Sequence, residues 1–260
     1  MNSRIIRTFA LLRAQKKTAF MPFLVAGYPT FEDSVDIAKV LAPHAHVLEI
    51  GFPFSDPLAD GPTIQAADQV ALKQGMDTDR VFEYIRSVRK FYTSPIVVLV
   101  YANIVYQKGI DTFYEQAKVV GVDGILVPDA PFEEIQDFHK AAQKYHIDQI
   151  FLVSQTTSHT RLKRIVAQAS GFLYLVSILG VTGVRKKLSV NLPKLIRCVK
   201  RETRLPVVVG FGIATQAQVR LLKRAGADGI IIGSALVQVI QRSSKGHYRN
   251  DITNFICKLN

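Results

Sequence analysis

Eight short apolar runs recur along this chain of 260 residues, and turn residues bound each of them. The runs span residues 20–26, 47–50, 96–101, 124–127, 149–153, 172–176, 206–209 and 229–232. Most of the segments between them carry apolar residues at helical spacing, which distinguishes helices from strands. Because strands that are apolar on both faces are typical of parallel sheets with helices outside, we expect strand and helix to alternate throughout.

Eight strand–helix units in about 250 residues fit a (β/α)8 barrel. An open doubly wound sheet needs fewer strands and usually carries a GxGxxG fingerprint, which this sequence lacks. We therefore expect an α/β fold, a (β/α)8 TIM barrel, with residues 1–260 forming a single domain. Residues 3–15 should form an extra amphipathic N-terminal helix over one end of the barrel, and residues 62–74 an extra helix in the long gap after the second run. Pro131 should begin another helix, since proline is favoured in a first turn.

Charge and composition narrow the classes of function. The chain is 48% hydrophobic, enough for a sizeable core, and its formal net charge of +12 raises the question of nucleic acid binding;. Lys194, Arg197, Arg201 and Arg204 fall on one predicted helix face. A solvated face is the commoner reason for such a stripe, so we expect no nucleic acid partner.

Cysteine usage and hydropathy indicate the compartment. Cys198 and Cys257 lie far apart and lack metal-ligand spacing;. The first residues do not read as a signal peptide, and no apolar stretch approaches membrane-spanning length. The sequence therefore predicts a cytoplasmic protein with no membrane association, no metal site and no disulfide framework.

The segment after the second apolar run is the most irregular part of the sequence. Residues 49–62 contain prolines at 53, 57 and 62, glycines at 51 and 61, and carboxylates at 49, 56 and 60. Proline removes backbone donors and glycine marks turns, so a shaped loop is expected. Glu49 ends the preceding strand, where burial would favour its protonated form and suit a proton donor. Asp60 ends the loop, and two such acids can divide acid and base work; for Glu49 alone, the alternative is a structural carboxylate that caps a backbone amide.

Glycines follow the last three apolar runs, in the segments 180–183, 210–213 and 233–234. The active site of a barrel lies at the carboxyl ends of the strands, often with a phosphate site after strands 7 and 8. Backbone amides beside glycines can approach an anion closely, so these segments together predict a phosphate site, although ordinary turns would explain any one of them. The basic segment 180–188 is either a lid over an anionic ligand or an exposed loop. Tyr174, within the sixth run, is either a site residue or an aromatic that fills the barrel.

These motifs resemble those of the tryptophan synthase α subunit family, over about residues 21–240. The most specific is the segment 48–65, LEIGFPFSDPLADGPTIQ. The motifs Tyr101-Ala102-Asn103, Gly180-Val181-Thr182-Gly183, Gly210-Phe211-Gly212-Ile213 and Gly233-Ser234-Ala235 follow in the family order. The family cleaves indole-3-glycerol phosphate to indole and glyceraldehyde 3-phosphate, a retro-aldol lyase reaction of tryptophan biosynthesis.

The resemblance implies a role for each matching residue. Glu49 would protonate the indole ring at the carbon that bears the glycerol chain and later accept the hydroxyl proton. Asp60 would hold the indole N–H and offset the charge that protonation creates. The substrate-binding residues implied by the family motifs are Tyr101, Tyr174, Thr182, Gly183, Phe211, Gly212, Gly233 and Ser234.

The resemblance also implies a partner. Family members pair with a β subunit that holds pyridoxal phosphate, so we expect an α2β2 heterotetramer and no cofactor in this chain. Residues 53–56 and 101–106 correspond to surfaces that face this partner. The chain departs from the family pattern at Val70 and Ile178, where arginine is usual, which bears on communication with the β subunit rather than on chemistry.

Two other functions compete with the lyase. Another barrel enzyme acting on sugar phosphates would explain the glycines but not the pairing of Glu49 with Asp60. A subunit that only activates its β partner would not need Glu49, Asp60 and Thr182, and this sequence has all three. The retained acids therefore favour the lyase.

Overall fold

Eight parallel strands close into a barrel in the computed structural model, which describes residues 3–176, 191–210, 212–244 and 247–259. The strands are β1 (Ala19–Val25), β2 (Leu48–Gly51), β3 (Ile96–Leu99), β4 (Gly124–Leu126), β5 (Asp148–Val153), β6 (Leu173–Val176), β7 (Val207–Gly210) and β8 (Gly229–Ile232). Each pairs with its neighbours in sequence, and β8 closes the barrel against β1. The predicted (β/α)8 barrel is confirmed, and each strand coincides with one apolar run to within two residues.

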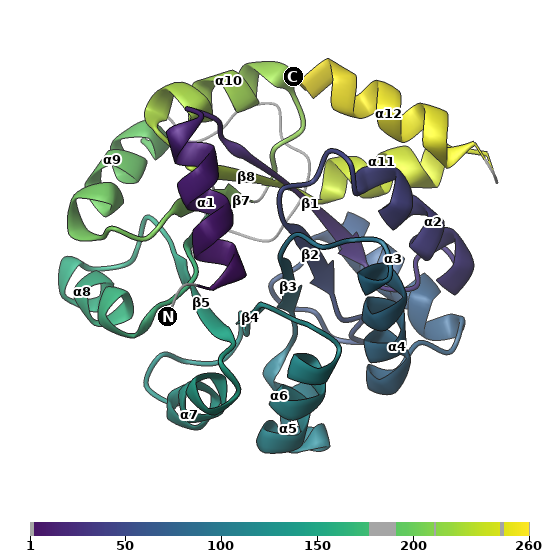
Figure 1. Ribbon diagram of the computed structural model, residues 1–260, viewed down its shortest axis with the longest axis horizontal. Helices are drawn as coiled ribbons and strands as arrows, with labels where there is room; N and C mark the ends of the chain where they lie inside the picture. Colours follow the sequence, from purple (N-terminus) through teal and green to yellow (C-terminus); the bar gives the residue numbers. More distant parts are fainter. Residues whose placement is uncertain (1–2, 177–190, 211, 245–246, 260) are drawn as a thin grey trace.

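Helices surround the barrel (Figure 1). They are α1 (Arg4–Ala14), α2 (Phe31–Leu41), α3 (Pro62–Lys73), α4 (Thr78–Arg89), α5 (Ala102–Lys108), α6 (Ile110–Val119), α7 (Gln136–Tyr145), α8 (His159–Gln168), α9 (Leu192–Glu202), α10 (Gln216–Ala225), α11 (Ser234–Arg242) and α12 (Tyr248–Leu259). Side chains of Ser3, Thr30, Asp77, Ser158 and Thr215 accept hydrogen bonds from backbone amides at the starts of α1, α2, α4, α8 and α10. Local sequence therefore fixes where these helices begin.

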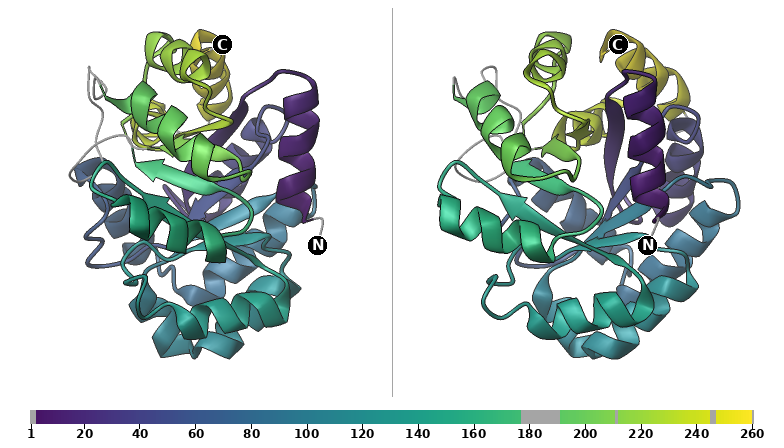
Figure 2. Two further views of the ribbon diagram at one scale, coloured as in Figure 1. Left: turned by 90° about the vertical axis from the view of Figure 1, so that its left-hand side faces the viewer. Right: turned by 60° about the vertical axis from the view of Figure 1, so that its left-hand side comes forward.

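Helix α1 covers the amino ends of the strands, as the N-terminal apolar stripe predicted. Its buried residues include Ile5, which packs where β4 begins at Gly124, and Phe9, whose ring lies 6.0 Å from that of Phe172 just before β6. Figures 1 and 2 show the helix lying across this end of the barrel. With this end closed, the carboxyl ends of the strands are left for a site.

Helix α7 begins at Gln136, so the expected start at Pro131 is wrong. Residues 131–135 form a turn in which the Glu134 amide donates to the Pro131 carbonyl over 2.9 Å. Contacts outside the helix hold this turn, because the Phe132 ring packs against Phe151 and lies beneath the Arg164 guanidinium. Across the described residues, no helix is both long and apolar enough to cross a bilayer.

Candidate active site

Glu49 points into the barrel from β2. The strand register sets it level with Phe23 of β1 and Val97 of β3, and alternation along the strand turns Leu48 and Ile50 toward the helices. Glu49 is fully buried, and neither carboxyl oxygen has a hydrogen-bond partner in the described part of the chain. It therefore caps no backbone amide there, contrary to the structural alternative.

Burial decides the protonation state of Glu49. Loss of solvation, reinforced by the nearby charge of Asp60, raises the pKa of Glu49 to about 8. The carboxyl consequently holds its proton at neutral pH, as a general acid must.

Asp60 lies in the loop between β2 and α3 and is 6% exposed. Its Oδ2 accepts a hydrogen bond of 2.7 Å from the Tyr101 hydroxyl. Burial raises the pKa of Asp60 to about 6, while the bond from Tyr101 opposes the rise. Asp60 is therefore largely ionised at neutral pH, so the two acids differ in charge although both are buried.

Tyr101 holds the loop that carries Asp60. Besides donating to Asp60, its hydroxyl accepts a 3.1 Å hydrogen bond from the Ala59 amide, and its ring stacks on Phe54 with centroids 5.0 Å apart. The Gln65 side chain also donates to the Asp60 carbonyl over 2.8 Å. Tyr101 therefore holds Asp60 in place, and its predicted part in substrate binding stays a prediction.

A narrow cavity of about 30 Å³ lies beside Asp60, at the carboxyl ends of the strands. It is lined by Phe23, Asp60, Ile64, Leu99, Tyr174, Gly212, Ile231, Gly233 and Ser234. The structure thus brings five of the predicted site residues to one cavity.

Small residues make room for the aromatic rings of the cavity. A Cβ on Gly210 of β7 would overlap the phenol of Tyr174 on β6, and one on Gly51 would overlap the ring of Phe23. Tyr174 is 3% exposed, and burial raises the pKa of its hydroxyl well above the usual value, so the hydroxyl is neutral. Gly210 is therefore required by the position of Tyr174.

The start of α11 also lines the cavity. Gly233 precedes the helix and Ser234 is its first residue, with 8% exposure. Backbone amides at a helix start favour an anion, and Gly212 lines the same cavity with a φ of 76°. Thr182, Gly183 and Phe211, also predicted as binding residues, lie outside the described residues, as do Ile178 and the basic segment 180–188.

Several residues near the site were not predicted from the sequence. The apolar lining of Phe23, Ile64, Leu99 and Ile231 looks like ordinary core until the barrel register is known. Asp68 is 3% exposed on α3, one turn beyond Ile64, and burial together with the charge of Asp60 raises its pKa to about 9. A carboxylate among the apolar positions of an amphipathic helix was the available clue.

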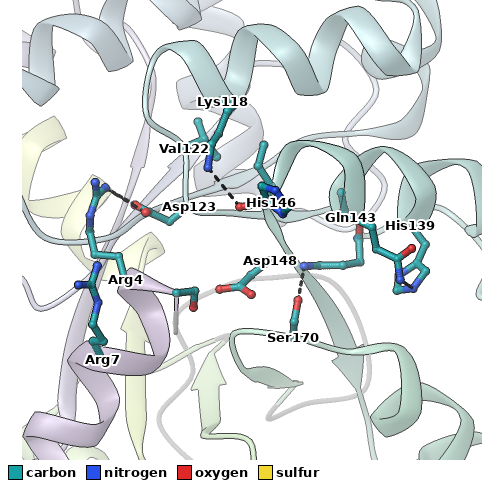
Figure 3. A pocket seen from close by; sticks show the side chains of 14 residues that line it. Arg4, Arg7, Lys118, Val122, Asp123, His139, Gln143, His146, Asp148 and Ser170 are labelled. Atoms are coloured by element: carbon teal, nitrogen blue, oxygen red, sulfur yellow. Dashed lines mark hydrogen bonds and ion pairs between the residues drawn. The ribbon is translucent and has the colours of Figure 1, made fainter. Parts of the chain in front are cut away.

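A larger cavity, of about 560 Å³, lies at the opposite end of the barrel between α1 and α7 (Figure 3). Asp148, the first residue of β5, lies at its centre between the arginines of α1 and the side chains of α7. Its Oδ2 is buried without a partner in the described chain. None of the predicted site residues lines this cavity, and no cluster of three metal-ligating side chains occurs among the described residues.

Comparison with known proteins gives one consistent result. Residues 9–259 match the model of the family described as "Tryptophan synthase alpha chain". The tryptophan synthase alpha chain of Methanothermobacter thermautotrophicus is 50% identical over 231 residues, which is 88% of this chain and 86% of that protein.

Solved structures agree with this match. A Mycobacterium tuberculosis tryptophan synthase structure superposes with a TM-score of 0.90 at 31% identity, covering 99% of this chain and 96% of that one. The tryptophan synthase alpha chain of Legionella pneumophila gives a TM-score of 0.90 at 33% identity, with 99% and 95% coverage.

Proposed function

The chain belongs to the tryptophan synthase alpha chain family, and on this premise we propose that Glu49 and Asp60 carry out its reaction. The alpha reaction cleaves indole-3-glycerol phosphate to indole and glyceraldehyde 3-phosphate. One observation carries the assignment: Glu49 is buried without a hydrogen-bond partner in the described chain and keeps its proton, while Asp60 nearby is ionised.

In the first step, the Glu49 proton passes to the ring carbon that bears the glycerol chain. Glu49 becomes a carboxylate and the ring becomes positively charged. The Asp60 carboxylate accepts a hydrogen bond from the indole N–H and offsets this charge, and a water-poor site strengthens that interaction. Tyr101 keeps Asp60 in place through its 2.7 Å hydrogen bond.

In the second step, the hydroxyl on the neighbouring side-chain carbon gives its proton to Glu49. The bond between that carbon and the ring breaks, and its electron pair returns to the ring. Indole and the aldehyde are released, and Glu49 regains the proton with which it began.

The phosphate binds opposite these acids, at Gly212, Gly233 and Ser234. Support comes from the helix start at Gly233 and from its place in the same cavity as Asp60. Family motifs extend this phosphate site to Thr182, Gly183 and Phe211, and Tyr174 closes the indole side.

The family implies a β-subunit partner, and we place its docking surface around the loop after β2 and helix α5. Leu58 in that loop is 82% exposed, Tyr106 on α5 is 52% exposed and Val70 on α3 is 37% exposed. All three belong to the segments that follow β2 and β3, and exposed apolar side chains are typical of protein interfaces. The assembly would be an α2β2 heterotetramer, with pyridoxal phosphate in the β subunit only.

Indole release from indole-3-glycerol phosphate, measured with and without a β subunit, tests the assignment. We expect Glu49→Gln and Asp60→Asn each to lower kcat about 100-fold or more, with unchanged circular dichroism. Wild-type turnover by Glu49→Gln would show that the acid is misassigned. A wild-type chain that stimulates its β subunit but releases no indole in either arm would be an activator and not a lyase.

A further inference from the structure

The basic excess of this chain is concentrated in one part of the sequence. Between Gln149 and Ala227 the only acidic residue is Glu202, whereas lysines and arginines are frequent. Glu202 is turned toward α8, with its carboxylate 3.1 Å from the Nε2 atom of His159. Residues 149–227 include helices α8, α9 and α10, so the flank of the barrel that these helices cover is strongly cationic.

The fold gathers cations from α9 and α10 into one surface. Helices α9 and α10 pack side by side on the outside of the barrel (Figure 1). We define the α9–α10 basic face as seven exposed residues: Lys194, Arg197 and Arg201 on α9, Arg204 just beyond its end, and Arg220, Lys223 and Arg224 on α10. The sequence shows each stripe separately, but only the barrel places the two stripes next to each other.

The charges of this face are not neutralised. Within the described residues, none of the seven side chains takes part in a salt bridge, and Lys200, which binds Asp228 at 2.9 Å, is excluded from the set. Some cations elsewhere on the surface are paired, as in Lys140 with Asp137 and Lys144 with Asp111. The basic face is therefore open to an external polyanion.

The dimensions of the face suit rows of phosphates. Residues 194–202 of α9 cover about 12 Å along the helix axis at about 1.5 Å per residue;, and packed helices lie about 8–10 Å apart. Two rows of cations at this separation match the width of DNA grooves, about 6–12 Å. We propose that the α9–α10 basic face binds double-stranded nucleic acid through its phosphates, without regard to base sequence.

The composition of the face argues against other polyanions. Helices α9 and α10 contain no aromatic residue, and aromatic side chains are what single strands stack on and what protein interfaces use as anchors. The large apolar side chain exposed on these helices is Leu221, at 42%, which is little for membrane insertion. Arginine predominates, and its guanidinium suits phosphate oxygens.

The face leaves the proposed active site and partner surface free. Helices α9 and α10 flank β6, β7 and β8, whereas the proposed β-subunit surface follows β2 and β3 on the opposite wall of the closed barrel. Nucleic acid could therefore bind without displacing the β subunit. Our expectation of no nucleic acid partner depended on reading the stripe on α9 alone.

Fluorescence anisotropy with a labelled 20-base-pair DNA duplex, and a duplex RNA of the same sequence, tests the proposal on the full chain with and without its β subunit. At 100 mM NaCl we expect saturable binding that weakens steeply with salt.

The double variant Arg197→Glu with Arg201→Glu should raise Kd at least tenfold, and its lyase activity should not change. The matched control, Lys140→Glu with Lys144→Glu on α7, alters net charge equally and should change Kd less than threefold. The duplex with the lower Kd, DNA or RNA, is the nucleic acid that the face prefers.

Three results would overturn the proposal. One is no binding of either duplex at 100 mM NaCl. Another is an equal loss of affinity in the α7 control, which would make binding a net-charge effect. The third is tighter binding of a poly-glutamate peptide or of phosphatidylserine vesicles, which would assign the face to an acidic protein or a membrane.

Discussion

Glu49, Asp60 and Asp68 are three buried carboxyl groups, and their surroundings separate their protonation states. Burial raises the pKa of all three, and among the described residues only Asp60 accepts a hydrogen bond, from Tyr101, that favours the charged form. The result is one ionised acid beside two protonated ones at neutral pH. This division suits a reaction that needs a proton donor and a fixed negative charge together.

The first residue-scale prediction is the pH dependence of kcat/KM. Asp60 must be ionised, so activity should fall as pH drops through about 6, and Glu49 must be protonated, so activity should fall as pH rises through about 8;. A bell-shaped profile between these values is expected in the indole-release assay. Activity that keeps rising to pH 9 would contradict Glu49 as the proton donor.

The second residue-scale prediction concerns Asp68→Asn. The pKa of Asp68 is raised to about 9 in the folded state, whereas it is about 4 in the unfolded chain. Between pH 4 and 9 the unfolded chain has therefore lost this proton and the folded chain has kept it, so stability falls as pH rises across this range. The amide cannot ionise. We expect the variant to gain about 1–3 kcal/mol at pH 8 and almost nothing at pH 4, measured by urea unfolding. Asp137→Asn, on an exposed face, is the control, and an equal gain at both pH values would refute the linkage.

At the scale of elements, neighbouring strands share the work of shaping the cavity. Tyr174 of β6 occupies space that Gly210 of β7 leaves empty, and Phe23 of β1 does the same beside Gly51 of β2. Helix α3 begins directly after the loop and holds Asp60 through Gln65. Each chemical group is thus positioned by an adjacent element, not by its own strand alone.

The element-scale prediction is that Gly210→Ala displaces Tyr174. The new methyl group would overlap the phenol, so we expect a loss of about 1–3 kcal/mol in stability and at least a tenfold fall in kcat/KM. The same change in a Tyr174→Ala background should cost much less stability, because the clash is gone. Equal costs in both backgrounds would show that Tyr174 is not the constraint.

At the scale of the whole molecule, three surfaces have different chemistry. The cavity lies at the carboxyl ends of the strands, an apolar group around Leu58 and Tyr106 faces outward from the walls of β2 and β3, and the basic face lies on the other flank. Their separation predicts that catalysis, the proposed docking and the proposed polyanion binding can be changed independently.

The whole-molecule prediction is that Leu58→Asp weakens activation by the β subunit. A charge at this exposed apolar position should raise the β-subunit concentration for half-maximal activation at least tenfold, because it must be desolvated on docking. Indole release without the β subunit should remain. Leu11→Asp, 64% exposed on α1 at the other end of the barrel, is the control, and identical behaviour of the two variants would remove Leu58 from the interface.

The amino-acid sequence alone predicted the eight strands, the N-terminal helix and the two acids Glu49 and Asp60. These depend on local properties, namely apolar periodicity, capping residues and an irregular proline loop. It could not show that Tyr101 donates a hydrogen bond to Asp60 or that Glu49 lacks a partner in the described chain. Nor could it show that Asp68 lies near Asp60 and Tyr101.

Those relations depend on the three-dimensional fold, because they join residues that barrel closure brings together. Tyr101 and Asp60 are separated by 41 residues in sequence, and the stripes of α9 and α10 become one surface only when β6, β7 and β8 are adjacent. The pKa values follow from the same cause, since desolvation and the charge of a neighbour depend on packing in three dimensions.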